Sequence, residues 1–316
     1  MLRKFFLPVA AMLVLGAATL SGGCGGAGGT TLALISMLLV ADYGNNRVAG
    51  FTDMAGSGWV AYDDVGGGAG QISGPYKIAV DSQGRIYISD YNNSRIVRID
   101  DITGAGWVSF SVGSAPRGIF VDGDGRIYFA LENHTVNRMD DMTGTNLVTF
   151  GTSGSGVGEF STPTAIYVDS QDRIYVGDSS NSRIVRISDM GGAGWTTFGS
   201  NGTGVGEFGS NIEKIVRGEG GNLVISDYDN DRLVRINDIS GAGWTTFGSF
   251  GAGDLQFDNP SGVLYDPRMD QYYVVDNGND RVVRFDDFVG TGWTAFGASG
   301  SGVGQFGDAY DLAALR

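Results

Sequence analysis

Short runs of alternating hydrophobic and polar residues, separated by turns rich in glycine, asparagine and aspartate, fill the chain from about residue 31 to its end. Within residues 78–110, the runs IAVD, IYISD, RIVRID and WVSF are separated by the polar segments SQGR, YNNS and DITGAG. Period-two alternation between such turns is typical of an antiparallel β-meander. The pattern therefore predicts a unit of four short strands.

The four-stranded unit recurs at a nearly constant interval. Six equivalent positions mark the copies, in the order Trp59, Trp107, Leu147, Trp195, Trp244 and Trp293, with spacings of 48, 40, 48, 49 and 49 residues. Four-stranded units repeated at this interval are the blades of a β-propeller. The sequence thus predicts an all-β fold, a six-bladed β-propeller of four-stranded antiparallel blades that spans residues 31–316.

The two ends of the repeat region complement each other. The first copy opens with MLLVAD at residues 37–42, which matches the second strand of the other copies, so its own first strand is missing. The last residues, 305–316, match the opening of a copy and then stop. We therefore expect the C-terminal strand to complete blade one, which removes two exposed sheet edges at the junction.

The blades resemble NHL repeats. The resemblance lies in the segment IYVGD at residues 174–178, which is followed by Asn181 and by Arg183 and Ile184. Five of the six blades carry the Asp/Asn/Arg set: Asp42/Asn45/Arg47, Asp90/Asn93/Arg95, Asp178/Asn181/Arg183, Asp227/Asn230/Arg232 and Asp276/Asn279/Arg281. Because a motif in nearly every blade is better explained by blade construction than by catalysis, we expect Asp and Arg to pair across a tight turn.

The N-terminal residues have the layout of an export signal. Arg3 and Lys4 precede the apolar run 5–20, which is shorter than a membrane-spanning helix requires. Small residues and Cys24 follow in an order that resembles a bacterial lipoprotein box, although Leu20 stands four residues before the cysteine instead of three. We predict a signal peptide over residues 1–23, a lipidated Cys24 and a glycine-rich tether over 24–30; signal cleavage that leaves an unmodified thiol is the alternative.

Composition narrows the range of functions. The chain has 316 residues and a net charge of −14, from 21 Lys and Arg against 35 Asp and Glu. This charge argues against nucleic-acid binding, because phosphate recognition relies on clustered Lys and Arg. One cysteine and one histidine, His134, exclude a disulfide framework and a Cys/His zinc cluster. The 54 glycines fit the many turns of the repeat.

The meander topology assigns much of the acidity to one face. Turns between the first and second strands and between the third and fourth strands share that face, and they carry Asp81, Asp100, Asp101, Asp122, Asp124, Asp140, Asp141, Asp169, Asp172, Asp238, Asp286 and Asp287. We predict a solvated acidic rim and no cofactor; specific Ca²⁺ binding is the alternative, since calcium takes about six to eight oxygen ligands. A glycine-rich turn such as DITGAG at residues 101–106 precedes each tryptophan position. In this turn we expect the leading aspartate to accept hydrogen bonds from backbone N–H groups and a glycine to adopt a positive φ.

One pair of positions differs between otherwise similar blades. It lies just before the innermost strand, at the mouth of the axial channel, where the fold does not demand a particular residue. We predict a concave polar ligand site there, formed by Tyr76, Lys77, Arg117, Glu213, Lys214, Tyr310 and Asp311. Ordinary drift at an exposed rim is the alternative.

The sequence shows no catalytic motif in a suitable structural context. We therefore expect a non-catalytic, monomeric, exported propeller that binds a protein or glycan partner at the bacterial cell envelope, either lipid-anchored or secreted. Its membrane contact would be the N-terminal anchor alone. The alternative is an enzyme, because propellers that this chain resembles include metal-dependent sugar-lactone hydrolases and lyases whose site lies at the channel mouth.

Overall fold

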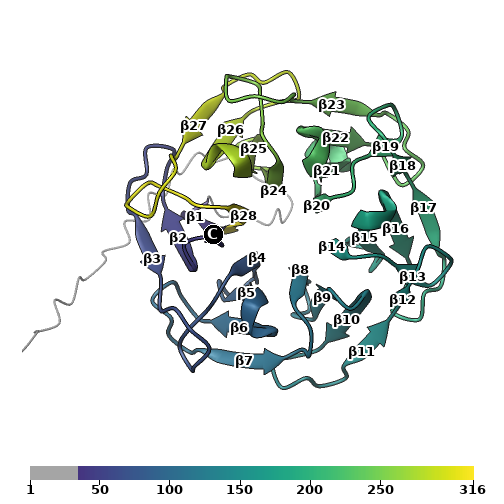
Figure 1. Cartoon of the computed structure of the whole chain (residues 1–316), viewed down its shortest axis with the longest axis horizontal. Helices are drawn as coiled ribbons and strands as arrows, with labels where there is room; N and C mark the ends of the chain where they lie inside the picture. The colour runs from purple at the N-terminus through teal and green to yellow at the C-terminus, as the bar shows by residue number, and fades with distance from the viewer. Residues whose placement is uncertain (1–34) are drawn as a thin grey trace, which may run out of the picture. The chain divides into compact units, whose positions relative to one another are not determined.

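In the computed structural model, which describes residues 35–316, six four-stranded antiparallel sheets surround a central axis (Figure 1). Blade one consists of β28 (Ala309–Leu315), β1 (Met37–Asp42), β2 (Arg47–Phe51) and β3 (Val60–Tyr62). Blade two consists of β4 (Pro75–Val80), β5 (Ile86–Asp90), β6 (Arg95–Ile99) and β7 (Val108–Ser111). Blade three consists of β8 (Pro116–Val121), β9 (Ile127–Leu131), β10 (Thr135–Met139) and β11 (Val148–Phe150).

The remaining three blades repeat this order from the axis outward. Blade four consists of β14 (Pro163–Val168), β15 (Ile174–Asp178), β16 (Arg183–Ile187) and β17 (Thr196–Phe198). Blade five consists of β20 (Ile212–Arg217), β21 (Leu223–Asp227), β22 (Arg232–Ile236) and β23 (Thr245–Phe247). Blade six consists of β24 (Pro260–Asp266), β25 (Gln271–Asp276), β26 (Arg281–Phe285) and β27 (Thr294–Phe296). The predicted fold class is confirmed.

Short elements occupy the connections. Two parallel pairs lie between blades: β12 (Thr152–Ser153) with β13 (Glu159–Phe160), and β18 (Ser200–Asn201) with β19 (Glu207–Phe208). Single 3₁₀ turns connect strands: η1 (Tyr91–Asn93), η2 (Ser179–Asn181), η3 (Glu219–Gly221), η4 (Tyr228–Asn230) and η5 (Asn277–Asn279). Within residues 35–316, no helix has the length and apolar character needed to cross a membrane. The predicted signal peptide, Cys24 and the tether lie outside the described residues.

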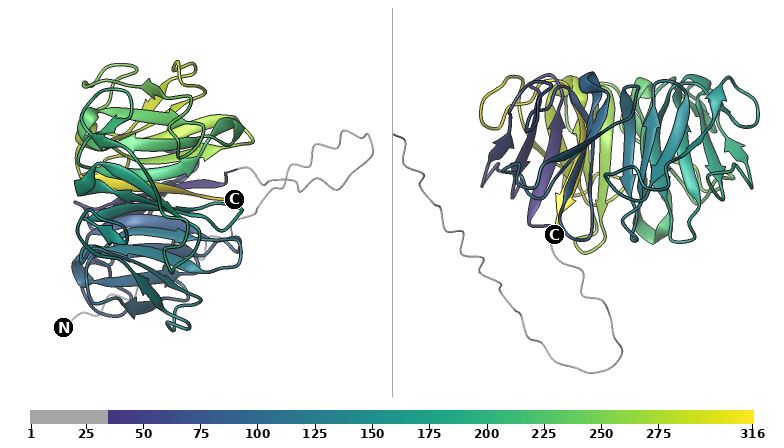
Figure 2. Two further views of the ribbon diagram at one scale, coloured as in Figure 1. Left: turned by 90° about the vertical axis from the view of Figure 1, so that its right-hand side faces the viewer. Right: turned by 90° about the horizontal axis from the view of Figure 1, so that it is seen from below.

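The C-terminal strand closes the ring, as the sequence predicts. β28 pairs antiparallel with β1 from Met37 opposite Leu315 to Asp42 opposite Ala309. In each blade the chain crosses the disc four times (Figure 2). We call the face where the innermost strands begin the front face, which is toward the viewer in Figure 1, and the opposite face the rear face. The turns between the first and second strands and between the third and fourth strands, which carry the aspartates of the predicted acidic rim, therefore lie on the rear face.

Aromatic side chains pack blades against the connections that lead into them. In blade four, Trp195 lies against Phe160 at 5.4 Å between ring centroids, and the Arg183 guanidinium lies 5.8 Å from the Trp195 ring. Phe160 is fully buried and comes from the connection that leads into the same blade. The repeated tryptophan therefore binds a blade to its own incoming connection, by apolar burial and by a cation–π contact.

Candidate functional site

The mouth of the channel is shaped by β-bulges. The pairing of each innermost strand with its neighbour shifts register near its front end, for example between Pro75 and Ile78 in β4 and between Ile212 and Lys214 in β20. Bulges re-aim side chains and are common next to functional sites. The seven predicted site residues lie in or beside these bulges: Tyr76 and Lys77 in β4, Arg117 in β8, Glu213 and Lys214 in β20, and Tyr310 and Asp311 in β28.

Four of these side chains form buried ion pairs across the axis. Lys77 Nζ lies 2.8 Å from Glu213 Oε2, and Lys214 Nζ lies 2.7 Å from Asp311 Oδ2. Lys77 is 1% exposed and Asp311 is fully buried. Because these charges are paired with one another inside the channel, they form a plug near its mouth.

The plug also includes a phenol and a backbone amide. The Tyr76 hydroxyl donates to Glu213 Oε1 at 2.9 Å, and the backbone N–H of Ile78 donates to Asp311 Oδ2 at 3.0 Å. Burial raises the pKa of Tyr76, and the negative charge of Glu213 acts in the same direction. Burial lowers the pKa of Lys214, while the neighbouring Asp311 carboxylate opposes this shift. Blades one, two and five are thereby joined at the axis.

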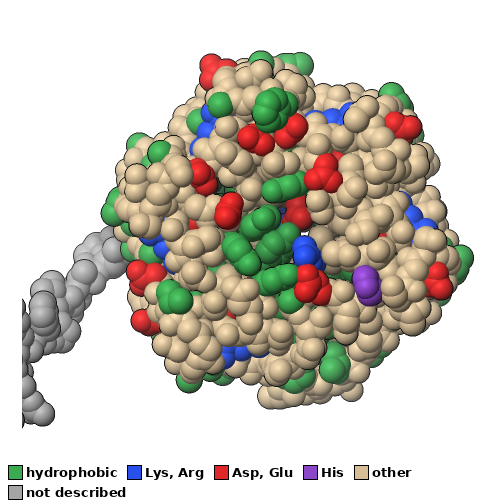
Figure 3. Space-filling model, in the orientation of Figure 1, with side chains coloured by type: hydrophobic (Ala, Val, Ile, Leu, Met, Phe, Trp, Pro, Cys, Tyr) green, Lys and Arg blue, Asp and Glu red, His purple; other side chains and the backbone are tan. Residues whose placement is uncertain are grey.

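A layer of aromatic rings covers the plug on the front face. We call Tyr43, Tyr76, Tyr91 and Tyr310 the tyrosine cluster. Tyr76 stacks on Tyr310 with ring centroids 4.5 Å apart, and Tyr43 contacts Tyr310 edge-on at 5.5 Å and Tyr91 at 6.1 Å. The space-filling view shows hydrophobic side chains gathered at the centre of this face, beside basic and acidic groups (Figure 3).

An ion pair borders the tyrosine cluster. The Arg117 guanidinium lies 5.6 Å from the Tyr76 ring and 5.5 Å from the Tyr91 ring, and Arg117 donates to Glu132 Oε1 at 2.6 Å. The Tyr91 hydroxyl donates to the same oxygen. Burial and this hydrogen bond raise the pKa of Tyr91 to about 12. Against the effect of burial, hydrogen bonds from Tyr91 and Arg117 lower the pKa of Glu132, so Glu132 is an anion at neutral pH.

Sequence reasoning missed three members of this region, namely Tyr43, Tyr91 and Glu132. All three follow the second strand of their blade directly, at the position after the repeat aspartate or its equivalent. This position also varies between blades, with Tyr228 and Asn277 in blades five and six, and the Tyr228 hydroxyl donates to Asn277 Oδ1 at 3.1 Å. A comparison of the blades at the turn between the second and third strands would have identified this variable position.

The repeat residues hold each blade to the connection that precedes it. Asp178 accepts hydrogen bonds from Ser161 N at 2.6 Å, Asn181 Nδ2 at 2.9 Å and Arg183 Nε at 2.8 Å. Arg183 also donates to Ser155 O at 2.7 Å. Equivalent Asp–Arg contacts occur in four further blades: Asp42 with Arg47, Asp90 with Arg95, Asp227 with Arg232, and Asp276 with Arg281. Asn93 donates to Asp90 in the same way.

His134 has a backbone-binding role in the turn of blade three. It has a φ of +68°, and its Nδ1 accepts a hydrogen bond from Thr162 N at 3.0 Å. Ser94 and Ser182 occupy the equivalent left-handed position in blades two and four. Thr162 lies in the connection to the next blade, so His134 joins blades three and four.

On the rear face, several aspartates are bound within their own turns. Asp81, Asp122 and Asp169 pair with Arg85, Arg126 and Arg173, respectively, each at 2.6 Å. Arg126 also reaches Asp172 at 2.6 Å, which connects blades three and four. Across the part of the chain that the structure describes, no three His, Cys, Asp or Glu side chains are grouped so that they could hold a metal ion. The absence of a cofactor stays a prediction, with Ca²⁺ binding as its alternative.

Comparison with known proteins agrees with this architecture. A chain of the nidogen/laminin complex superimposes with a TM-score of 0.67 at 16% identity, covering 88% of this chain and 98% of that chain. A protein of unknown function from Bacteroides caccae superimposes with a TM-score of 0.65 at 15% identity, covering 90% of this chain and 100% of that chain. A catalytically inactive virginiamycin B lyase from Staphylococcus aureus, solved with quinupristin, superimposes with a TM-score of 0.54 at 17% identity. The match covers 81% of this chain and 83% of that chain. At these identities the likeness concerns the fold alone.

The chain is therefore a six-bladed β-propeller. Residues 73–99 and 160–187 match the family model of the NHL repeat, so the propeller contains NHL repeats, as the Asp/Asn/Arg pattern indicates. These segments contain the first three strands of blades two and four. A search of curated protein sequences gives no match to the chain.

Proposed function

We propose that this protein is an exported, non-catalytic binding module that takes a protein or glycan partner on its front face at the bacterial cell envelope. The tyrosine cluster with Arg117 beside it is the observation that carries the proposal. Tyrosine and arginine are enriched at binding hot spots, because a rigid ring buries a large area at low entropic cost and also offers a hydroxyl group. The same rings suit the apolar faces of sugars.

The state of the charged groups supports binding over catalysis. Lys77, Glu213, Lys214 and Asp311 are paired with one another below the rings. A general acid or base has to reach the proton that it transfers, whereas the carboxylates of Glu213 and Asp311 are held by their lysine partners. Above them, Tyr43, Tyr91 and Tyr310 are partly exposed and offer a contact surface.

The proposal is tested by capturing a partner from envelope extracts or on a glycan array and by measuring its affinity for variants. The double variant Tyr91→Ala/Arg117→Ala removes a partly exposed ring and the cation beside it, and we expect at least about a tenfold loss of affinity. Arg268→Ala removes an exposed arginine from the β24–β25 hairpin on the rear face and should leave the affinity unchanged. Equal affinity of the double variant and the wild type would contradict the proposal.

A metal-dependent hydrolase or lyase is the second candidate. Its support is the fold shared with the Staphylococcus aureus lyase, together with the carboxylates of Glu213 and Asp311 near the channel mouth. Metal analysis of the purified protein combined with a lactonase assay separates the two candidates. Turnover that depends on a bound metal would favour the enzyme.

A further inference from the structure

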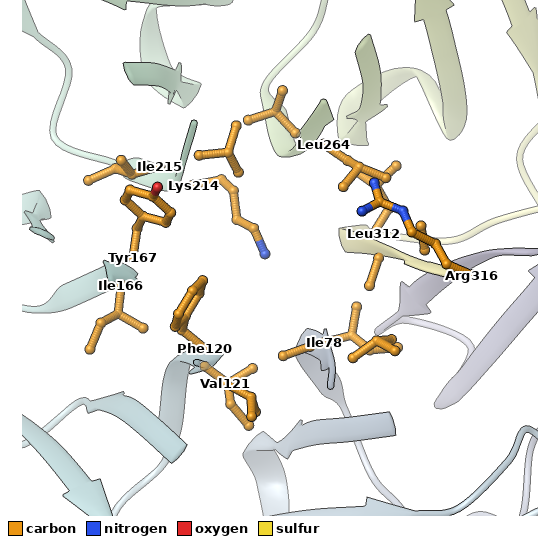
Figure 4. Close-up of a pocket in the computed structure, with 17 residues that line it drawn as sticks. Ile78, Phe120, Val121, Ile166, Tyr167, Lys214, Ile215, Leu264, Leu312 and Arg316 are labelled. Atoms are coloured by element: carbon orange, nitrogen blue, oxygen red, sulfur yellow. The ribbon is translucent and has the colours of Figure 1, made fainter. Parts of the chain in front are cut away.

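The axial channel holds a second feature, on the rear side of the plug. A cavity of about 300 Å³ lies along the axis and is lined by residues of all six innermost strands (Figure 4). Its size is at the lower end of the range of about 300–1,000 Å³ that is usual for small-molecule pockets. Lys214, which belongs to the plug, also lines this cavity.

One position of each innermost strand contributes a side chain to the walls of the cavity. The six equivalent residues are Ala79, Phe120, Tyr167, Val216, Leu264 and Ala313, and all of them line it. Phe120 and Tyr167 contact each other edge-on at 5.6 Å on one side. Alanines in blades one and two leave space on the other side. A ring of six large side chains would fill the channel, so the two alanines are what keeps it open.

Two cationic side chains point into this apolar space. Figure 4 shows the Lys214 amine and the Arg316 guanidinium directed toward its centre. Their acidic partners, Asp311 and Asp266, are buried and do not line the cavity. The Arg316 side chain is 35% exposed, and its contact with Asp266 Oδ1 is long, at 3.7 Å. Arg316 is therefore available for another acceptor.

Lys214 also has unused donors. An ammonium group has three N–H donors. Within residues 35–316, Lys214 Nζ donates one hydrogen bond, to Asp311 Oδ2. The cavity thus combines apolar walls with two positive groups that retain hydrogen-bonding capacity.

We propose that this cavity binds a small amphiphile that has an apolar body and a single anionic group, such as a medium-chain carboxylate. The apolar body displaces water from the walls formed by Phe120, Tyr167 and Leu264, and the anion is bound by the Arg316 guanidinium, with the positive charge of Lys214 in support. The acidic rear face disfavours ligands with several negative charges, such as polyphosphates, because like charges repel. The site is on the other side of the plug from the tyrosine cluster and is independent of it.

The proposal is tested by isothermal titration of the full chain with decanoate and with decanol. We expect saturable binding of decanoate at one site and at least tenfold weaker binding of decanol, which lacks the charge. Arg316→Ala should weaken decanoate at least tenfold, and Arg316→Lys should restore part of the loss because it keeps the charge. Equal affinity for decanoate and decanol, or no effect of Arg316→Ala, would overturn the anionic part of the proposal.

Two variants test the location of the ligand. Ala79→Phe places in blade two the residue that blade three has at Phe120, and Ala313→Phe makes the equivalent change in blade one. Each should reduce decanoate affinity at least tenfold while the circular dichroism spectrum stays that of the wild type. Tyr91→Ala/Arg117→Ala on the front face should leave decanoate binding unchanged. Full affinity in both folded filling variants, or no heat with millimolar decanoate, would refute the site.

Discussion

Asp178 shows how one residue serves both its own turn and the neighbouring connection. Its buried carboxylate accepts hydrogen bonds from Asn181 and Arg183 of the turn, and from the backbone of Ser161, which lies in the connection before blade four. A carboxylate that lies in the interior is stable as an ion when its oxygens are occupied by donors. Desolvation by burial nevertheless raises the pKa of Asp178, against the opposing effect of these hydrogen bonds.

Replacement of this carboxylate should destabilise the protein strongly. Asp178→Ala leaves the Ser161 amide and Arg183 Nε without their acceptor, and we expect a loss of about 3 kcal/mol in the free energy of unfolding. Asp124→Ala, at a side chain that is 78% exposed on the rear face, should change it by less than about 0.5 kcal/mol. Urea unfolding of both variants measures the difference. Equal stabilities would show that Asp178 does not hold the blade to its connection.

At the scale of one element, the glycine turn between β10 and β11 lowers the pKa of its aspartate, Asp141. Asp141 Oδ1 accepts hydrogen bonds from the Thr143 hydroxyl at 2.6 Å and the Thr143 amide at 2.8 Å, and Gly144 has a φ of +80°. These hydrogen bonds, that of the hydroxyl first, lower the pKa of Asp141 to about 2. The stabilising effect is therefore present above the ordinary aspartate pKa of 3.8 and is lost as the pH falls toward 2.

Carbon-13 NMR titration of the carboxyl groups should give a midpoint near 2 for Asp141. Thr143→Val preserves the shape of the side chain and removes the hydroxyl donor, so we expect the midpoint to move toward 3.8. The midpoint of Asp287, whose turn carries Val289 at the position of Thr143, should not change in this variant. An Asp141 midpoint that Thr143→Val leaves in place would contradict the assigned cause.

The elements were predictable from the sequence to a greater extent than their contacts. Alternation and turn residues define each strand locally, so the blade order and the missing strand of blade one follow from the repeat. The pairing of Lys77 with Glu213 does not follow, because it joins two blades across the axis and depends on where each bulge directs its side chain. The variable positions could be found by aligning the repeats. Whether they form an open basin or a plug requires the three-dimensional arrangement.

At the scale of the whole molecule, β28 connects the last residues of the repeat to the first. Leu312 of β28 is buried and lies opposite Val40 of β1. In an open repeat array, each unit contacts its neighbours alone, so the units can unfold separately. In a closed ring, every blade is flanked on both sides, and opening at β28 exposes two blade faces at once. We therefore expect the six blades to unfold as one cooperative unit.

Leu312→Ala tests this coupling, because it removes a buried apolar side chain from the strand that closes the ring and packs against blade six. Tryptophan fluorescence reports on the five blades that contain Trp59, Trp107, Trp195, Trp244 and Trp293, and circular dichroism reports on all strands. We expect the two signals to give coincident urea transitions in the wild type and in the variant, with the free energy of unfolding lowered by about 3 kcal/mol. Leu315→Ala, at a half-buried side chain of the same strand, should have a smaller effect. Separate transitions in the wild type would mean that the blades unfold individually and that β28 does not couple them.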